Sequence, residues 1–263
     1  MRAALIQMDC RLLDAGVNRE CATRLMEATE ADLYLLPELF TSGYTFADPA
    51  EVEAIAEPAA DGPTLQWAQA FARRRHAWVA YGFPERDGHG FYNSASLVGP
   101  DGRVGTYRKM HLFGREKLFF TSGHEPAPVW QLPFGRVGLM ICFDWYFPEV
   151  CRSLALRGAQ LILQPANLVL PHCPQAMITR SLENRVFTMT CDRIGAERNG
   201  EAAHTFIGSS QVVTPLGEVL CRLSTDREET AVVELDLSRA EDKGVATYND
   251  LFGDRRRELY AGL

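Results

Sequence analysis

Apolar and polar positions follow two periods along this chain, one of about two residues and one of about 3.6 residues. Alternating and short apolar runs predict strands at residues 2–8, 32–37, 77–83, 91–98, 103–108, 136–142, 159–164, 187–194, 205–214, 218–223 and 230–236. The longer period predicts helices at about 17–30, 63–76, 148–157 and 174–186. In the second of these helices, Leu65, Ala68 and Phe71 share one face.

The ratio of helices to strands indicates the fold class. Four helices are too few for a barrel with one helix per strand, whereas two packed β-sheets flanked by helices, an α/β sandwich, fit the count. Turn signals at 99–103 and 215–217 predict antiparallel hairpins, so both sheets should be mixed. No linker or repeat interrupts the pattern, which predicts one domain over residues 1–263. The polar, aromatic-rich tail at about 244–263 is predicted to pack on a partner subunit.

Composition narrows the possible partners and location. A net charge of -7, with no basic run longer than three residues, argues against binding to nucleic acid or to an anionic membrane. No apolar segment reaches the roughly 20 residues that span a bilayer. The N-terminus has the pattern of a first strand rather than a signal peptide, and the seven cysteines form no CxxC pair. We therefore expect a cytoplasmic protein with reduced thiols.

Cys142 is the strongest candidate for chemistry. It ends the apolar run at 137–142 and precedes residues 143–149 (FDWYFPE), which predict a tight turn into a helix with Pro148 in its first turn. A thiol at such a strand-to-helix elbow faces amides that can stabilise a thiolate or an oxyanion. The alternative is that Cys142 is a small buried apolar residue, as free cysteines often are.

Two further polar residues follow predicted strands. Glu38 comes directly after an apolar strand, among neighbours that are unusually apolar for an exposed loop, and Lys109 follows the strand at 103–108. Strand ends are where open α/β sheets bind ligands. Glu38 could take the thiol proton of Cys142, while Lys109 and the backbone N–H of Phe143 stabilise the oxyanion. Read separately, each of the two charged side chains would more simply be a solvated surface residue.

Three segments resemble those of the nitrilase superfamily of carbon–nitrogen hydrolases, in the family's order. They are residues 36–40 (LPELF), 107–113 (YRKMHLF) and 141–149 (ICFDWYFPE). The resemblance extends over essentially the whole chain and is greatest to the small single-domain branch. It implies an αββα sandwich that dimerises into four layers, and a thiol mechanism without metal or other cofactor. It also implies a second glutamate that positions substrate or assists proton transfer, for which Glu116 is the best match.

The reaction expected from this resemblance is hydrolysis of a small carboxamide, with ammonia released through a thioester on Cys142. Nitrilases proper usually carry Cys-Trp-Glu at the nucleophile, whereas this chain has Cys-Phe-Asp at 142–144. A nitrilase or an N-carbamoyl amine or amino acid amidohydrolase is the alternative. Candidate residues for the substrate pocket are Tyr44, Phe113, Trp145, Tyr146, Asn167 and Leu168. No Arg or Lys is obviously placed for a substrate carboxylate, which leans against anionic substrates.

Three other classes of protein fit the sequence less well. The six histidines show no HxxxH or HxH spacing, which argues against a metalloenzyme. A Cys–His hydrolase that pairs Cys142 with His111 or His204 would leave Glu38 and Lys109 unexplained. His111 is expected instead to support the lysine loop by hydrogen bonding. A non-catalytic binding protein on this scaffold remains the remote alternative.

Overall fold

Two six-stranded sheets form the centre of the molecule. The computed structural model describes residues 1–88 and 90–260. The first sheet has the order β14 (Glu229–Glu234), β1 (Arg2–Gln7), β2 (Leu33–Leu35), β3 (Trp78–Asp87), β4 (Gly90–Gly99) and β5 (Gly102–Arg108). The second has the order β13 (Val219–Arg222), β12 (Gln211–Val213), β9 (Phe187–Cys191), β8 (Leu161–Pro165), β7 (Gly135–Leu139) and β6 (Val129–Leu132).

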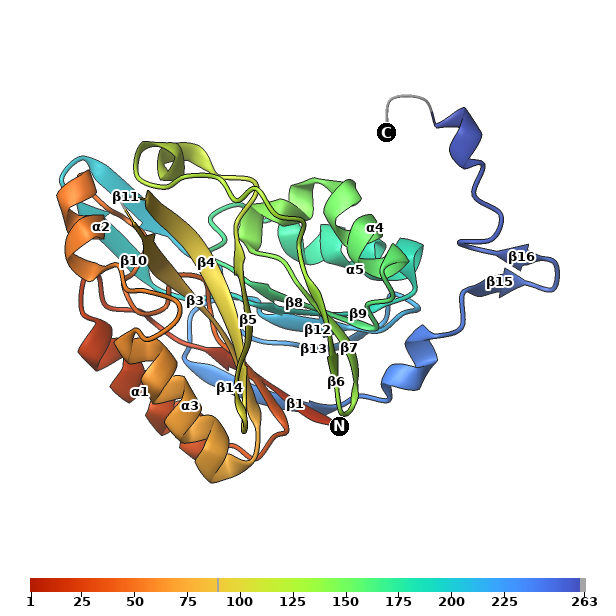
Figure 1. Cartoon of the computed structure of the whole chain (residues 1–263), viewed down its shortest axis with the longest axis horizontal. Helices are drawn as coiled ribbons and strands as arrows, with labels where there is room; N and C mark the ends of the chain where they lie inside the picture. The colour runs from red at the N-terminus through yellow and green to blue at the C-terminus, as the bar shows by residue number, and fades with distance from the viewer. Residues whose placement is uncertain (89, 261–263) are drawn as a thin grey trace.

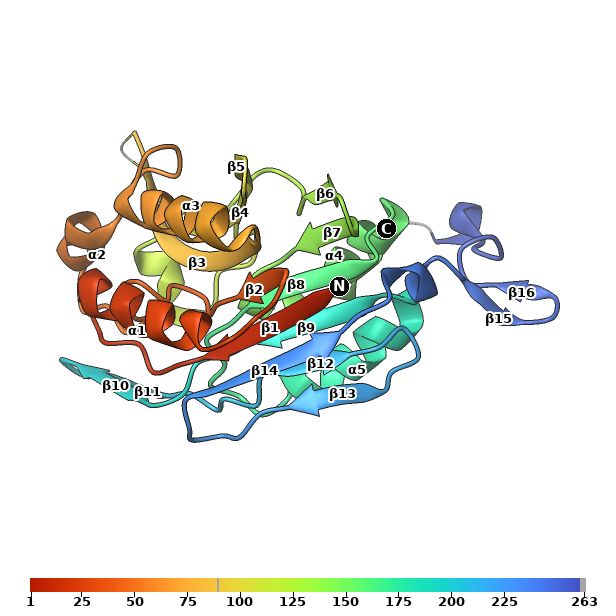
Figure 2. The same ribbon diagram turned by 90° about the horizontal axis from the view of Figure 1, so that it is seen from below.

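The two sheets face each other and helices cover their outer faces (Figures 1 and 2). The helices are α1 (Ala15–Glu27), α2 (Pro49–Ile55), α3 (Pro63–Arg75), α4 (Pro148–Leu156) and α5 (Cys173–Asn184). Helices α1 and α3 pack on the first sheet, whereas α5 packs on the second and α4 lies against α5. Each sheet pairs three neighbouring strands in parallel and the rest antiparallel. The predicted αββα sandwich of two mixed sheets is therefore confirmed.

Alternation along the strands builds the layers. Leu33 and Leu35 of β2 belong to the apolar core between the sheets, while Tyr34 between them packs under the helices. This is the two-residue period of a strand that is buried on both faces. Strand β2 of the first sheet and strand β7 of the second each pair in parallel with neighbours in their own sheet. The loop that carries Glu38 begins where β2 ends, and the loop that carries Cys142 begins where β7 ends.

Several element boundaries differ from the prediction. The strand predicted at 136–142 ends at Leu139, because the chain must turn into the 3-10 helix η2 (Cys142–Tyr146). The strand predicted at 205–214 is divided between β11 (Ala202–Thr205) and β12, because Gly208 and Ser209 adopt positive φ angles of 57° and 58°. Helix α2 was missed, although Asp48 caps it and Pro49 opens it. Strand β6 was also missed.

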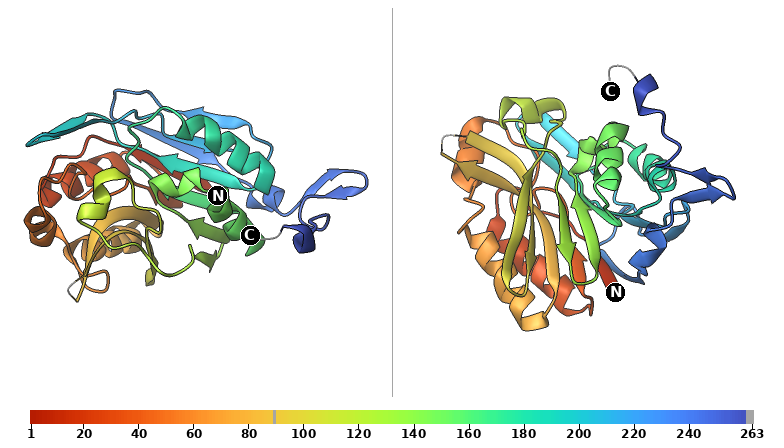
Figure 3. Two further views of the ribbon diagram at one scale, coloured as in Figure 1. Left: turned by 90° about the horizontal axis from the view of Figure 1, so that it is seen from above. Right: turned by 45° about the vertical axis from the view of Figure 1, so that its right-hand side comes forward.

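Two small hairpins extend from the sandwich. Strands β10 (Ala196–Asn199) and β11 (Ala202–Thr205) form one, and β15 (Gly244–Ala246) and β16 (Asn249–Asp250) form the other. The second hairpin belongs to the tail, which projects away from the body of the protein (Figure 3). Tyr248 in this tail is 92% exposed. Packing of the tail on a partner subunit stays a prediction, and its residues 261–263 lie outside the described residues.

No helix within residues 1–88 and 90–260 has both the length and the apolar character needed to cross a membrane.

Candidate active site

Glu38 lies in a tight turn that is fixed to the neighbouring strand. The chain leaves β2 at Leu35, and the backbone N–H of Phe40 donates to the Gly82 carbonyl of β3 at 3.1 Å. A Cβ atom on Gly82 would lie 2.6 Å from the Cα of Glu38, so only glycine permits this close approach. The Glu38 side chain is completely buried as a result.

Lys109 is the first residue after β5, and its ammonium group is completely buried between two carboxylates. Its Nζ lies 2.6 Å from Glu38 Oε1 and 2.7 Å from Glu116 Oε1. Glu116 comes from the 3-10 helix η1 (Gly114–Leu118). The two carboxylates offset the free-energy cost of burying the ammonium group. An unpaired ammonium at this place would strongly destabilise the fold. Lys109 thus forms ion pairs with both Glu38 and Glu116.

Two more side chains donate hydrogen bonds to the carboxylates of this cluster. Asn93 Nδ2 of β4 donates to Glu38 Oε1 at 2.7 Å and to Glu116 Oε2 at 3.3 Å. The Tyr44 hydroxyl donates to Glu116 Oε1 at 2.7 Å. Sequence reasoning placed Tyr44 in a substrate pocket but missed Asn93. The only signal for Asn93 was a polar side chain in an apolar strand.

Two buried oxygens of these side chains, Glu38 Oε2 and Asn93 Oδ1, have no hydrogen-bond partner in the described part of the chain. A buried carboxylate oxygen without a donor is costly in a folded protein. Glu38 Oε2 is therefore the carboxylate oxygen of the cluster that is free to accept a proton from a group that enters the site.

Cys142 lies on the predicted elbow. Its φ angle of 40° is in the left-handed region, which is rare for a residue with a side chain. The backbone N–H groups that follow belong to the first turn of η2, and N–H groups of a first helical turn lack partners within their helix. Pro148 opens α4 as predicted, and Gly158 follows the end of this helix with φ of 88°. The Asp144 N–H of the η2 turn donates to the Ile141 carbonyl at 3.0 Å, and the elbow presents the thiol beside the Phe143 N–H.

Asp144 ties the elbow to the lysine segment, a link that sequence reasoning did not find. Its Oδ2 accepts from Ile141 N–H at 2.9 Å and from the Tyr107 hydroxyl at 2.8 Å. Its Oδ1 lies 2.8 Å from His111 Nδ1. The expected support of the lysine loop by His111 is therefore present, through the carboxylate of Asp144.

Burial dominates the ionisation of these groups. It raises the pKa of Cys142 well above that of an ordinary thiol, Glu38 raises it further, and nearby Lys109 only partly opposes the rise. Burial alone would lower the pKa of Lys109, but Glu116 and Glu38 raise it above its usual value. Burial also raises the pKa of Glu116, against the opposing charge of Lys109. Cys142 is therefore a neutral thiol at rest, and it needs a base at the moment of attack.

A small pocket opens at Cys142. Five of the six predicted pocket residues line it: Phe113, Trp145, Tyr146, Asn167 and Leu168. Its water-accessible space is about 30 Å³, room for about two water molecules. Both side-chain polar atoms of buried Asn167 lack a hydrogen-bond partner within the described ranges. Such a pocket suits a small group with a polar atom that Asn167 can bind. The sixth residue, Tyr44, lines an adjoining cavity together with Phe113.

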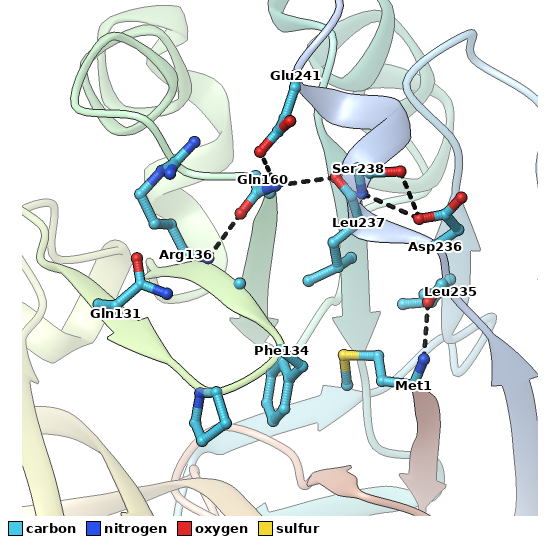
Figure 4. Close-up of a pocket in the computed structure, with 12 residues that line it drawn as sticks. Met1, Gln131, Phe134, Arg136, Gln160, Leu235, Asp236, Leu237, Ser238 and Glu241 are labelled. Carbon is cyan, nitrogen blue, oxygen red and sulfur yellow. Dashed lines mark hydrogen bonds between the residues drawn. The ribbon is translucent and has the colours of Figure 1, made fainter.

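A larger, open cavity lies elsewhere, between the β6–β7 hairpin and the segment 235–241 (Figure 4), with about 620 Å³ of water-accessible space. Its polar side chains bond with one another, as Gln160 does with the backbone N–H of Arg136 and with Glu241. Within the described residues, no buried polar atom of its lining lacks a partner. The cavity is thus larger than the Cys142 pocket but has neither a nucleophile nor an unsatisfied polar group.

Comparison with known proteins identifies the family. The carbon-nitrogen hydrolase family model matches residues 2–243. The chain therefore belongs to the carbon–nitrogen hydrolase family, as the resemblance to the nitrilase superfamily implied, and it is a hydrolase of C–N bonds other than peptide bonds.

Two relatives and one solved structure illustrate the similarity. A protein named nitrilase from Pyrococcus abyssi is 45% identical over 99% of both chains. An (R)-stereoselective amidase from a Pseudomonas species is 35% identical over 98% of this chain and 93% of its own. The structure of a variant of the amidase from Nesterenkonia sp. AN1, with acrylamide added to its active-site cysteine, has a TM-score of 0.80 at 29% identity and covers 98% of both chains.

Proposed function

We propose that this protein is an amidase that releases ammonia from small carboxamides through a thioester on Cys142. The observation that carries the proposal is the arrangement around the thiol. Cys142 borders a pocket on a strained elbow, and its pKa responds to the charges of Glu38, Lys109 and Glu116. The described structure leaves one oxygen of Glu38 without a donor. The Nesterenkonia amidase, which carries acrylamide on its active-site cysteine, supports the same role for a cysteine here.

In the first half-reaction, Cys142 Sγ attacks the amide carbon while Glu38 Oε2 takes the thiol proton. Lys109 and the Phe143 N–H stabilise the negative oxygen of the tetrahedral intermediate. When the C–N bond breaks, Glu38 returns the proton to the leaving nitrogen, and ammonia departs. The neutral resting thiol suits this sequence, because proton transfer and attack occur together.

In the second half-reaction, water attacks the thioester carbon and Glu38 accepts one of its protons. The C–S bond breaks, the carboxylic acid leaves, and the proton on Glu38 restores the thiol of Cys142. Glu116 positions Lys109 and the substrate amide during both steps, since its two oxygens lie 2.7 Å and 2.9 Å from Lys109 Nζ. The residues invoked account for every proton transferred, with no cofactor.

A nitrilase is the second candidate, favoured by the name of the Pyrococcus abyssi relative. Nitrile hydrolysis adds one further water, through a thioimidate, before ammonia leaves. Phe143 and Asp144 favour the amidase, since nitrilases proper usually carry Trp-Glu at these positions. An N-carbamoyl amine or amino acid amidohydrolase would use the same thiol and release carbon dioxide together with ammonia.

Ammonia release over a panel of aliphatic amides, ω-amides, N-carbamoyl compounds and nitriles tests the proposal. We expect the best kcat/KM on an amide and at least about a 10³-fold loss in Cys142→Ala. Cys151→Ala, which removes another buried thiol outside the pocket, is the matched control and should keep its activity. A preferred nitrile would support the second candidate. Wild-type turnover by folded Cys142→Ala would overturn the mechanism.

A further inference from the structure

The cavity next to the Cys142 pocket, lined by Tyr44 and Phe113 among others, has an aromatic wall and a basic residue, Arg115. The proposed reaction on its own explains neither. We propose that this cavity holds the far end of the amide substrate and that this end carries a carboxylate, which Arg115 binds at the cavity mouth. The inference rests on the proposed amidase function and adds a substrate class to it, the monoamides of dicarboxylic acids. It reverses the sequence-based expectation that no basic residue is placed for such a group.

The position of the cavity connects it to the reacting groups. Phe113 lines both this cavity and the Cys142 pocket, while Tyr44 and Glu116 form part of its wall. The same Tyr44 and Glu116 are hydrogen-bonded to each other, and Glu116 is bonded to Lys109. Figure 1 shows the segment around η1 at the same end of the molecule as the hairpin of β10 and β11. Strand β11 contributes His204 to the lining of the cavity. A ligand in this cavity therefore lies beside the candidate catalytic cluster.

Size and lining favour an extended substrate. The water-accessible space of about 160 Å³ is roughly five times that of the Cys142 pocket, which holds about 30 Å³. Aromatic side chains provide most of the wall: Tyr44, Phe46, Phe113, Phe119 and Phe120. An alkyl chain between the amide and a terminal group would fill this space and displace water from apolar surface.

The charges select the terminal group. Arg115 makes no salt bridge with any residue that the structure describes. Its Nη2 donates to the Ala47 carbonyl at 3.4 Å, and its guanidinium lies over Phe119, 5.7 Å from the ring centroid. His204 at the same cavity is fixed by a 2.9 Å hydrogen bond between its Nδ1 and Thr45 Oγ1. Lys109, Glu38 and Glu116 together carry a net negative charge when ionised. A substrate carboxylate is therefore repelled from the Cys142 end and attracted to Arg115 at the mouth.

Paired substrates test this inference. The kcat/KM for succinamate, glutaramate and adipamate is compared with that for butanamide, pentanamide and hexanamide, in wild type, Arg115→Ala and Arg115→Lys. We expect at least one acid to be preferred about tenfold over its neutral partner, with the preference lost in Arg115→Ala through KM and partly retained in Arg115→Lys. Added salt should narrow the preference, because Arg115 is exposed.

Lys117→Ala is the matched control. Lys117 lies on the same 3-10 helix and is exposed, but it does not line the cavity. Its replacement removes the same charge and should leave the preference unchanged. Neutral amides preferred at every chain length, or equal effects of the Arg115→Ala and Lys117→Ala changes, would overturn the inference.

The two proposals fail in different ways. If the wild-type protein hydrolyses no amide, the amidase proposal fails. Glutaramate is then not consumed, so its binding to the protein can be measured directly. Calorimetry should still show glutaramate binding about tenfold more tightly than pentanamide, with the difference lost in Arg115→Ala. Equal binding of the two compounds would reject the carboxylate site itself.

Discussion

Within the described residues, two buried cations, Lys109 and Arg193, each pair with two carboxylates, and only one of the two clusters is built like an active site. The Lys109 cluster consists of Glu38, Lys109 and Glu116, and the Arg193 cluster of Asp9, Arg193 and Glu197. Lys109 and Arg193 are both completely buried. Burial of the cation and its pairing with two acids therefore do not separate the two clusters, although the Asp9 side chain is 56% exposed and both features are often used as signs of function.

The difference lies in how completely their polar groups are paired. Arg193 donates to both acids and to the Cys10 carbonyl, and its guanidinium lies over Phe206. Both oxygens of Glu197 are engaged, one by Arg193 and the other by the Tyr44 and Thr45 N–H groups. In the Lys109 cluster, by contrast, Glu38 Oε2 is unpaired in the described structure and a thiol lies nearby. Incomplete pairing next to a cavity is the better sign of chemistry.

Replacing one carboxylate in each cluster should separate them most clearly. Glu38→Gln keeps the shape but removes the proposed base, so we expect kcat to fall by about 10²–10⁴-fold. Glu197→Gln changes the charge of the other cluster in the same way, and its activity should stay within about tenfold of wild type, since no proton transfer involves it. Steady-state ammonia release on the best amide measures both. Similar losses in the two variants would remove the distinction between the clusters.

The cations offer the next test. Lys109→Met leaves two buried carboxylates without their counter-charge, and we expect a loss of about 3–5 kcal/mol in unfolding free energy together with a fall of about 10²–10³-fold in kcat. Arg193→Met should cost a similar free energy of unfolding but have much less effect on kcat. Urea denaturation and turnover per folded molecule measure the two quantities. A modest loss of kcat in folded Lys109→Met would reduce Lys109 to a structural role.

Sequence reasoning found the Lys109 cluster but not the Arg193 cluster. Glu38, Lys109 and Cys142 each follow a strand, and the resemblance of their three segments to those of the nitrilase superfamily brought them together. Arg193 follows β9 as well, but Asp9 lies 184 residues away and nothing local links the two. Tyr44 and Glu116, 72 residues apart, meet only because the loops fold over the strand ends.

The fold was predictable where one side-chain period ran through an element, and not where backbone conformation ended it. The alternation of Leu33, Tyr34 and Leu35 identifies β2 as a strand buried on both faces. The early end of β7 follows from the turn that gives Cys142 its positive φ, and apolar residues up to 142 conceal that turn. The unpaired oxygen of Glu38 could not be predicted, because it depends on every donor around it.

The pH dependence should show the Lys109 cluster acting as a coupled group. Burial raises the pKa of Glu116 above 4.5, so kcat/KM should fall as the pH decreases through that raised value. Because the folded-state pKa is raised, the contribution of Glu116 to stability has the opposite sign and increases as the pH falls through it. The difference in unfolding free energy between wild type and Glu116→Gln, followed against pH beside the kcat/KM profile, measures both trends.

At basic pH, the ionisation of the Cys142 thiol can be followed. Burial raises the pKa of Cys142 well above its ordinary value, so no thiolate absorbance should develop as the pH rises through about 8.5, where a free cysteine ionises. The raised pKa of Lys109 keeps its contribution to stability complete below 10.5 and removes it only as the pH rises toward the folded-state value. A Cys142 thiolate signal at neutral pH would contradict the neutral resting thiol.

Tyr44 is hydrogen-bonded to both clusters, and its replacement should have the smallest effect on kcat/KM. Its backbone N–H donates to Glu197 at 2.9 Å and its hydroxyl donates to Glu116 at 2.7 Å, and burial raises its pKa so far that the hydroxyl keeps its proton. Tyr44→Phe removes one hydrogen bond to a charged acceptor, and we expect kcat/KM to fall by about tenfold. The Arg193 cluster would then influence the reaction through the position of the Tyr44 ring.

A double-mutant cycle with Glu197→Gln distinguishes this route from a general loss of stability. If Glu197 affects catalysis by holding Tyr44, the Glu197→Gln change should lower kcat/KM less in the Tyr44→Phe background than in wild type. Independent effects on kcat/KM would instead mean that the Arg193 cluster contributes only to folding. The Lys109 cluster would then hold its geometry through Lys109 and Asn93, without help from Tyr44.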